Sequence, residues 1–529
     1  MLARRIKHIT LLDSTLRDGA QGEDISFSVN DKLRILEALD SFGLDFIEAG
    51  NPGSNPKDLE FFRLAEVRKP NHAQLCAFGA TRRCNIAVED DASVQSLLAA
   101  NTPVVVLFGK SSLLHVTEIL KTTREENLRM ISETVSFFKK HGKKVIFDAE
   151  HFFDGYYASN DSAVYALKTL EAAQEAGADI VVLCDTNGGM LPYQVYEATA
   201  EAIAMLPADV PVGIHAHNDT GCAVANSIMA LEAGATHVQG TFIGFGERCG
   251  NADLSAILPA VILKMGHHCN GELLRLSETV NVVAEIANVI VPNNKPYVGT
   301  SAFAHKAGMH ADGVLKNSVS FEHIDPSKVG NKRNFLVSEV SGRSGVLKRV
   351  HGFAPNLAKD SPELTAILER LKALEHAGYQ FEAADASFEL MAKKVLGTYS
   401  PHFSVTFYKT MSEFPPGTDD LPSTAAIEIK VDGLTEIAAA KGRGPVHALD
   451  NALRKALVVF YPQLNDMHLV DFKVRVLDQK AATAATVRVL IESADAQTNW
   501  TTIGVSDDIL EASFIALVDS LEYKLAKDG

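Results

Sequence analysis

Eight short apolar runs, separated by segments with helical periodicity, occupy the first half of this 529-residue chain. The runs are rich in β-branched residues and lie at Ile9–Leu12, Phe46–Glu48, Leu75–Phe78, Val104–Phe108, Val145–Phe147, Ile180–Cys184, Val212–Ile214 and His237–Thr241. Short runs of this kind that alternate with helices are typical of parallel strands joined by helical crossovers. Eight such units in about 250 residues favour a closed (β/α)8 barrel over an open, doubly wound sheet.

Several of the helical segments end in glycine, at Gly43, Gly142, Gly177 and Gly234. Glycine often follows the last helical residue because it adopts the left-handed backbone conformation without strain. No G-x-G-x-x-G sequence follows the first apolar run, which argues against a dinucleotide-binding fold. We therefore predict an α/β chain in which residues 1–275 form a catalytic TIM barrel.

The rest of the chain has a different character and predicts two further parts. Residues 276–400 combine helical stretches with a segment rich in Gly, His and Lys, and we expect them to form helical linker subdomains. Residues 401–529 alternate apolar strands with two helices, which indicates a separate α+β domain containing two similar strand-plus-helix units. Within it, residues 412–424 have the composition of a loop.

Charge and cysteine content narrow the function classes. The net charge of −16 argues against a nucleic-acid surface, which needs clustered Lys and Arg. The six cysteines form no C-x-x-C pair and suggest no disulfide framework, which favours a reducing compartment. No segment has the roughly 20 consecutive apolar residues of a membrane-spanning helix. We expect a cytoplasmic protein with no membrane partner.

The first and seventh predicted strands are followed by residues that suit a metal ion. Arg17 and Asp18 follow the first strand in DSTLRDGAQ, and His215 and His217 end the seventh in GIHAHND. Residues two apart on an extended segment point the same way, so the two imidazoles converge. Two histidines and one carboxylate bind a divalent cation and leave positions open for a chelating substrate. Active sites of TIM barrels form where the strands end, so we predict a metal site there, with Arg17 beside it to stabilise an oxyanion.

Three more predicted strands end in polar side chains. Glu150 follows the fifth strand, Asp185 and Thr186 follow the sixth, and Glu247 and Asn251 follow the eighth. Each of these residues, taken singly, is as readily explained by structure as by function. Together they give five of the eight strand ends a functional group, which indicates an active site at this end of the barrel.

Two nearby residues are interpreted as structural. His151 follows Glu150 on an extended segment and therefore faces the other way, so we assign it to packing or to support of the site. Cys249 could act as a nucleophile, but no base is placed beside it, which favours a packing role.

Longer motifs containing these residues resemble a known family. DSTLRDGAQGEDISFSVNDKLRI, IEAGNPGSNPKDLEFF, FGKSSLLHVTEILKTTREENL, FDAEHFFDGYY, HAHNDTGCAVANS, GFGERCGNADL, FAHKAGMHADGVLKN and GRGPVHALDNALRKALVVFYPQL are similar to sequences of the citramalate synthase branch of the alpha-isopropylmalate/homocitrate synthase family. The resemblance covers nearly the whole chain. The first and fifth motifs are shared with lyases of the hydroxymethylglutaryl type, whereas FGKS…HVTE and EHFFDGY are narrower, and the assignment to the citramalate branch rests on them.

The resemblance implies a Claisen-type condensation of acetyl-CoA with pyruvate and water, which gives (R)-citramalate and CoA as the first step of the pyruvate route to isoleucine. Pyruvate would chelate a divalent metal, which could be Mn²⁺, Mg²⁺, Co²⁺ or Zn²⁺. It also implies a homodimer in which linker residues act in the partner subunit's barrel, and a C-terminal regulatory/dimerisation domain that binds isoleucine as feedback effector.

The resemblance also implies individual residue roles. The implied catalytic residues are Arg17, Glu150, Glu247, His310 and Asp312; the implied substrate contacts are Arg17, Asp18, Thr186 and Glu150; and the implied metal ligands are Asp18, His215, His217 and Asn251. One position departs from the pattern, because Phe321 stands where relatives commonly have Tyr before EHIDP. If that hydroxyl assists proton transfer, Tyr297 is a candidate substitute.

Three alternatives stay open at this point. A sibling 2-isopropylmalate or homocitrate synthase would use another 2-oxo acid, and one or two methylenes are worth only about 1–3 kcal/mol of discrimination. A lyase or carboxyltransferase could use the same barrel, although the C-terminal domain argues against a simple lyase. An amino-acid-sensing protein with a non-catalytic barrel is the third.

Overall fold

The computed structural model describes residues 6–306, 308–335, 343–413, 422–477 and 485–528. It divides into two compact units. The first contains the chain up to Phe303 together with Ile324–Arg333, and the second contains Ala304–His323 and the chain from Asn334 onward. Among the residues described, no helix is both long enough and apolar enough to cross a membrane.

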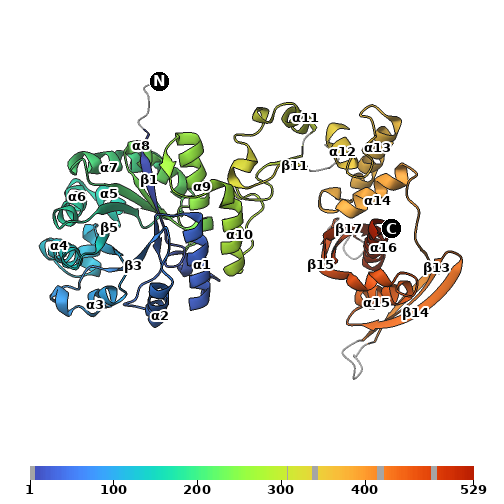
Figure 1. Cartoon of the computed structure of the whole chain (residues 1–529), viewed down its shortest axis with the longest axis horizontal. Helices are drawn as coiled ribbons and strands as arrows, with labels where there is room; N and C mark the ends of the chain where they lie inside the picture. The colour runs from blue at the N-terminus through green and yellow to red at the C-terminus, as the bar shows by residue number, and fades with distance from the viewer. Residues whose placement is uncertain (1–5, 307, 336–342, 414–421, 478–484, 529) are drawn as a thin grey trace. The chain divides into compact units, whose positions relative to one another are not determined.

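The first unit contains a closed barrel of eight parallel strands (Figure 1). They are β1 (His8–Asp13), β2 (Phe46–Glu48), β3 (Gln74–Ala80), β4 (Val104–Lys110), β5 (Lys144–Glu150), β6 (Ile180–Asp185), β7 (Val212–Ala216) and β8 (His237–Gly240). Neighbours in sequence pair with each other, and β1 pairs with both β8 and β2. The short β9 (His268–Cys269) pairs in parallel with the first residues of β1. The predicted barrel is confirmed, and each apolar run corresponds to one strand; β8 ends at Gly240, one residue short of the expected Thr241.

Helices surround the strands (Figure 1). They are α1 (Val29–Phe42), α2 (Pro56–Val67), α3 (Ala92–Ala99), α4 (Arg124–Lys140), α5 (Phe152–Ala158), α6 (Asn160–Glu175), α7 (Pro192–Met205), α8 (Ala223–Ala233), α9 (Leu254–Ala260) and α10 (Leu276–Ile286). Helix α1 begins at a capping box, in which the Ser28 hydroxyl accepts from the backbone N–H of Asp31 and the Asp31 carboxylate accepts from that of Ser28. Such a cap contributes about 1 kcal/mol. The helix ends at Gly43, whose φ of 94° is left-handed.

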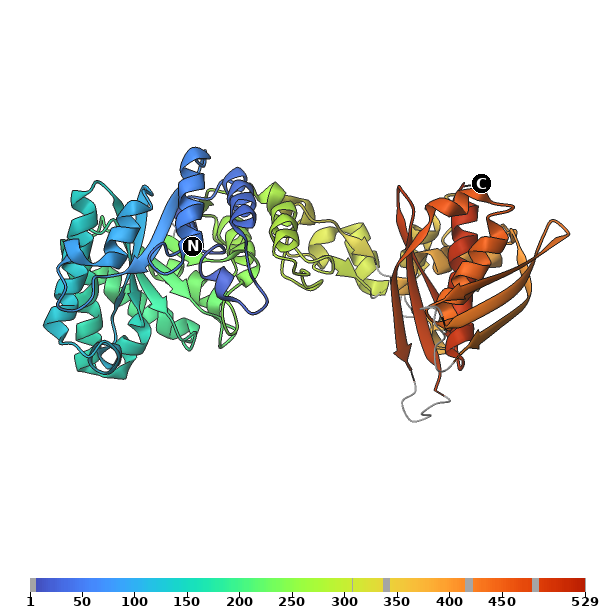
Figure 2. The same cartoon turned by 90° about the horizontal axis from the view of Figure 1, so that it is seen from below.

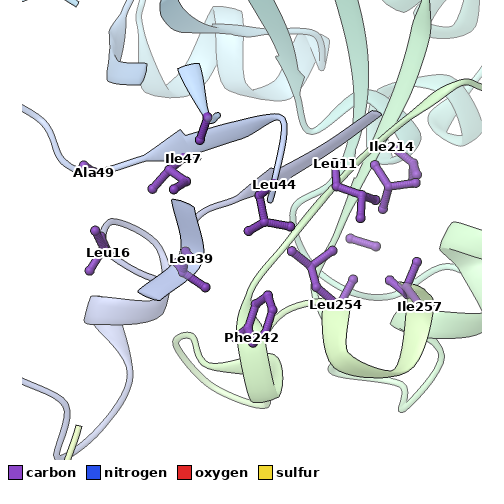
Figure 3. Packing of buried hydrophobic residues seen from close by; sticks show 14 of the residues in the cluster. Leu11, Leu16, Leu39, Leu44, Ile47, Ala49, Ile214, Phe242, Leu254 and Ile257 are labelled. Carbon is purple, nitrogen blue, oxygen red and sulfur yellow. The ribbon is translucent and has the colours of Figure 1, made fainter. Parts of the chain in front are cut away.

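Two apolar layers stabilise the barrel. The inner layer fills the barrel with side chains such as Leu12, Val106 and Ile146, and the outer layer lies between the strands and the helices. Figure 3 shows part of the outer layer, where Leu254 and Ile257 of α9 point toward Leu11 of β1. Because both faces of every strand are buried, the strands need nearly continuous apolar sequence, which is the pattern seen in the chain.

The second unit consists mainly of helices and two antiparallel, three-stranded sheets. Its helices are α11 (Gly308–Lys316), α12 (Arg343–Val350), α13 (Pro362–His376), α14 (Asp385–Val395), α15 (Pro445–Leu457) and α16 (Ile509–Asp528). Its longer strands are β12 (Ser404–Ser412), β13 (Ser423–Val431), β14 (Leu434–Gly442), β15 (His468–Val476), β16 (Val487–Ala494) and β17 (Asn499–Ser506), and the short β10 (Ala304–His305) pairs with β11 (Asn334–Phe335). Helix α15 packs on β13 and β14, and α16 packs on β16 and β17 (Figure 2).

The C-terminal part therefore contains three strands and a helix twice over, in agreement with the predicted α+β domain and its repeated units. The predicted loop 412–424 joins β12 to β13. Its ends belong to these strands, since Ser412 pairs with Ser423, and residues 414–421 lie outside the described residues.

Candidate active site

A cavity of about 300 Å³ opens at the C-terminal ends of the barrel strands. It is lined by Arg17, Asp18, Gln21, Asn51, Phe78, Phe108, Asp148, Glu150, Cys184, Thr186, His215, His217 and Glu247. Seven of the ten residues predicted to form the site are among them. Asn251 lies next to His217, with which it forms an isolated antiparallel β-bridge, while His310 and Asp312 belong to the second unit.

Asp18, His215 and His217 bring three ligand atoms together. Nε2 of His215 lies 3.4 Å from Nε2 of His217 and 3.4 Å from Oδ2 of Asp18, and Nε2 of His217 lies 4.0 Å from the same oxygen. All three residues are buried, and within the described ranges they form the one group of three or more His, Cys, Asp or Glu residues that could hold a metal. Bonds of about 2.0–2.2 Å to one ion would place neighbouring ligands about 3–3.5 Å apart, close to the spacing seen.

Unused polar atoms also fit a metal ion. Oδ1 of Asp18 and Oδ1 of Asn251 are buried without a hydrogen-bond partner in the part of the chain that the structure describes. A buried polar atom without a partner costs about 1–3 kcal/mol, so such a cluster needs a ligand or water. Nδ1 of His215 instead lies 2.9 Å from Oε1 of Gln239, which leaves Nε2 of that ring for a cation. The residues present therefore fit a divalent cation.

Neighbouring charges keep Asp18 ionised, and burial keeps His217 neutral. Burial opposes the ionisation of Asp18, but Arg17 and the two histidines outweigh it and hold the pKa of this carboxyl well below its usual range. Burial and the adjacent His215 lower the pKa of His217 to about 4. At neutral pH the site thus offers an anionic oxygen and an unprotonated imidazole, which are the states that bind a metal.

Arg17 is held in place from three sides. Its Nη1 lies 2.8 Å from Oδ2 of Asp18, its Nε lies 2.6 Å from Oε2 of Glu48, and its guanidinium carbon lies 3.6 Å from the centre of the Phe78 ring. Glu48 is fully buried at the end of β2 and also accepts a hydrogen bond from Ser14. A guanidinium fixed in this way can stabilise negative charge without reorganising.

Glu150 and Thr186 line the cavity from β5 and from the turn after β6. Glu150 forms an ion pair with Lys110. The Thr186 hydroxyl accepts a 2.9 Å hydrogen bond from the backbone N–H of His151, so its own proton can point at a substrate. His151 has a left-handed φ of 60°, and its ring stacks on His115 with 3.6 Å between ring centres. His151 is not among the residues that line the cavity, but the predicted reason is wrong: β5 ends at Glu150, so His151 is not on an extended segment.

The loop after β8 carries Glu247 and Asn251. Glu247 is half exposed and forms an ion pair with Arg248. Asn251 donates a hydrogen bond from Nδ2 to the carbonyl of Phe245 at 3.0 Å. Gly246 has a φ of 154°, and a side chain there would collide with Nδ2 of Asn251. Glycine is thus required at this position for Asn251 to keep its orientation.

Several residues that line or support the site are absent from the sequence-based prediction. Glu48 directly ends the second apolar run, so the rule that found Glu150 could have found it. Phe78 and Phe108 stack on each other, with 5.0 Å between ring centres. The sequence predicts only that they belong to strands, because an apolar residue inside a strand carries no sign that it faces a cavity. Cys184 is buried in the lining, whereas Cys249 is exposed, so the packing role predicted for Cys249 is wrong.

His310 and Asp312 lie on α11. The His310 ring is exposed and stacks on Phe321 with 4.3 Å between ring centres, and Asp312 accepts a 2.6 Å hydrogen bond from Lys316. Phe321, which stands where relatives have Tyr, thus contacts the predicted catalytic histidine. Tyr297 belongs to the first unit and is partly buried. The roles of His310 and Asp312 stay predictions.

Comparisons with known proteins agree with this architecture. Residues 8–283 match the HMGL-like family, residues 297–378 match the post-HMGL domain of homocitrate synthase, and residues 382–525 match the LeuA allosteric (dimerisation) domain. The chain is 51 % identical over 523 residues to the (R)-citramalate synthase of Aquifex aeolicus, with 98 % of each chain covered. It is 47 % identical to the (R)-citramalate synthase of Geobacter sulfurreducens, again with 98 % of each covered.

A probable 2-isopropylmalate synthase of Methanosarcina mazei is more distant, at 32 % identity over 99 % of this chain and 96 % of that one. Over nearly the same length of chain, the identity to the citramalate synthases is thus higher than the identity to this 2-isopropylmalate synthase. The chain therefore belongs to the HMGL-like family, within its LeuA/homocitrate synthase group and on the side of the (R)-citramalate synthases.

Proposed function

We propose that this chain catalyses the condensation of acetyl-CoA with pyruvate and water to give (R)-citramalate and CoA. One observation carries the proposal: the chain is 44–51 % identical to several (R)-citramalate synthases over nearly its whole length. The cavity that holds Asp18, His215, His217 and Arg17 supports it, because it suits a small oxygen-rich substrate beside a cation. A sibling synthase for a larger 2-oxo acid is disfavoured by the lower identity to that branch.

Asp18, His215 and His217, with Asn251 beside them, would hold the divalent cation, for which Mn²⁺, Mg²⁺, Co²⁺ and Zn²⁺ are all chemically suitable. When bound, the ion supplies Lewis-acid polarisation of a ketone oxygen. Arg17 lies next to this position and stabilises the negative charge that develops on that oxygen. Thr186 binds the substrate carboxylate by donating its hydroxyl proton, since its oxygen already accepts from His151.

Formation of the carbon–carbon bond requires two proton transfers. A base removes a methyl proton from acetyl-CoA, the resulting enolate attacks the ketone carbon of pyruvate, and the alkoxide takes up a proton. Water then cleaves the thioester and releases CoA. We assign acid–base roles to Glu150 and Glu247 in the cavity, and to His310 and Asp312, which reach the barrel of the partner subunit in a homodimer.

The apolar wall of the cavity favours a small oxo acid. Phe78 and Phe108 line it as a stacked pair, and most of the other lining side chains are polar. A methyl group can pack against these rings, whereas a branched side chain needs space that the rings occupy. This supports pyruvate as the oxo acid.

We further propose that residues 1–275 are the catalytic domain, residues 276–400 the linker and residues 401–529 the regulatory and dimerisation domain, in a cytoplasmic enzyme inhibited by isoleucine. A cavity of about 460 Å³ in the last of these supports an amino-acid effector. It combines apolar side chains such as Leu469 and Phe472 with polar ones such as Asn451 and Arg454, which suit an aliphatic side chain and a carboxylate.

The test is direct. Purified full-length protein is incubated with Mn²⁺, acetyl-CoA and pyruvate, 2-oxoisovalerate or 2-oxoglutarate; released thiol is followed by a chromogenic reagent, and the product is resolved by chiral chromatography. We expect thiol release mainly with pyruvate, (R)-citramalate as product, and a lower rate when isoleucine is added. A larger kcat/KM with either of the other acids would refute the assignment.

A further inference from the structure

Asp148 and Gln239 lie inside the barrel, where branched apolar side chains usually fill the space. Asp148 stands on β5, two residues after Ile146 of the inner apolar layer, and Gln239 stands on β8. Their exposed fractions are 3 % and 0 %. Burying a carboxylate and an amide is costly unless both are hydrogen-bonded, so the pair needs an explanation that packing does not give.

Two hydrogen bonds connect this pair to a predicted metal ligand. Nε2 of Gln239 donates to Oδ1 of Asp148 at 2.8 Å, and Oε1 of the same amide lies 2.9 Å from Nδ1 of His215. An ionised carboxylate can only accept, so Asp148 fixes which end of the amide faces it. The carbonyl end must then face His215 and accept the proton on its Nδ1.

We propose that Asp148 and Gln239 are positioning residues for the metal ion. Asp148 orients Gln239, and Gln239 holds His215 in the tautomer whose Nε2 lone pair faces Asp18 and His217. Outer hydrogen bonds of this type fix the ring orientation of a metal-binding histidine and raise its basicity. The inference rests on the metal site of the proposed function but concerns ion binding by the free enzyme, whichever oxo acid is condensed.

Three variants test whether Asp148 and Gln239 orient His215 or only satisfy each other's hydrogen bonds in the barrel interior. Gln239→Met keeps the length of the side chain and removes both hydrogen bonds. Gln239→Glu keeps an acceptor for His215 but sets a second carboxylate against Asp148. Adding Asp148→Asn to Gln239→Glu restores both hydrogen bonds, with donor and acceptor exchanged between positions 148 and 239. The new amide at position 148 donates to the new carboxylate at position 239, whose other oxygen accepts from His215.

The measurement is titration of metal-free, full-length protein with Mn²⁺ at about pH 8 in the absence of substrates, with the free ion followed by electron paramagnetic resonance and the fold checked by thermal unfolding. Burial raises the pKa of Asp148 to about 7, so this carboxyl is mostly ionised at the pH of the assay. We expect Gln239→Met to bind Mn²⁺ about 10- to 100-fold more weakly. Gln239→Glu should also bind weakly, and the double variant should bind within about threefold of wild type.

Thr10→Val is the matched control, because it removes a 2.9 Å hydrogen bond to His237, two residues from Gln239 on β8 and away from the trio. It should leave Mn²⁺ affinity unchanged. Wild-type affinity in Gln239→Met, or a double variant no better than Gln239→Glu, would overturn the proposal; if Gln239→Met does not fold, the second comparison decides. Wild-type protein that binds no Mn²⁺ overturns the metal site and this inference together, whereas Mn²⁺ binding without condensation overturns the proposed function alone.

Discussion

Phe108→Ala should widen the choice of oxo acid. Phe108 lines the cavity and stacks on Phe78, and it is the Phe78 ring that lies against Arg17. 2-Oxoisovalerate has two more carbons than pyruvate, and each buried CH₂ is worth about 0.8 kcal/mol. If the space left by the ring accepts both carbons, the gain is about 1.6 kcal/mol, or roughly 15-fold in relative kcat/KM.

The assay compares kcat/KM for the two acids at saturating acetyl-CoA in wild type and variant. We expect the ratio of 2-oxoisovalerate to pyruvate to rise roughly 15-fold, with the thermal unfolding temperature showing that the barrel is intact. Phe78→Leu is the contrasting variant: it removes the ring beneath Arg17, a contact worth about 0.5–2 kcal/mol, so activity with every acid should fall. A ratio that stays within twofold in Phe108→Ala would refute the idea that this wall selects the acid.

Three further predictions follow from single contacts. Lys32→Met leaves buried Asp58 without its 2.5 Å ion pair, so the free energy of unfolding measured in urea should fall by about 3–5 kcal/mol, and a loss below 1 kcal/mol would contradict this account. Gly246→Ala places a methyl group against Asn251, so Mn²⁺ affinity should fall at least about 10-fold; unchanged affinity would show that Asn251 has no part in the site. Arg17→Lys loses the two-sided contact with Asp18 and Glu48, so kcat should fall about 10²–10³-fold, and a rate near wild type would refute its role as oxyanion partner.

The barrel could be predicted because parallel strands that are buried on both faces need continuous apolar runs, and such runs are visible in one dimension. The metal-binding residues could be predicted for the same reason. Once the strands are placed, Asp18, His215 and His217 are seen to lie at or just after the C-terminal ends of β1 and β7. Residues two apart on a strand point to the same side, so the H-x-H sequence also predicts that the two rings converge. In the structure their Nε2 atoms lie 3.4 Å apart.

The interior of the site was less accessible. The hydrogen bond from Gln239 to Asp148 joins residues 91 positions apart, and it depends on closure of the barrel and on the register that sets His215 beside Gln239. Neither the closure of the barrel nor this register can be predicted from the local sequence pattern. The left-handed backbone of His151, which aims its N–H at Thr186, also has no local signal, since the residue is not glycine. His310 lies in a separate unit, so no pattern within the barrel could connect it to the site.

The central claim is that Asp18, His215 and His217 bind a divalent cation on which condensation depends. The most direct measurement is the rate of CoA release from acetyl-CoA and pyruvate after exhaustive dialysis against a chelator, before and after Mn²⁺ is added, in wild type and in His217→Ala. Wild-type protein should be inactive after dialysis and recover with about one Mn²⁺ per chain, and folded His217→Ala should stay inactive at the same Mn²⁺ concentration. Full activity of the dialysed wild type, or of His217→Ala, would contradict the account.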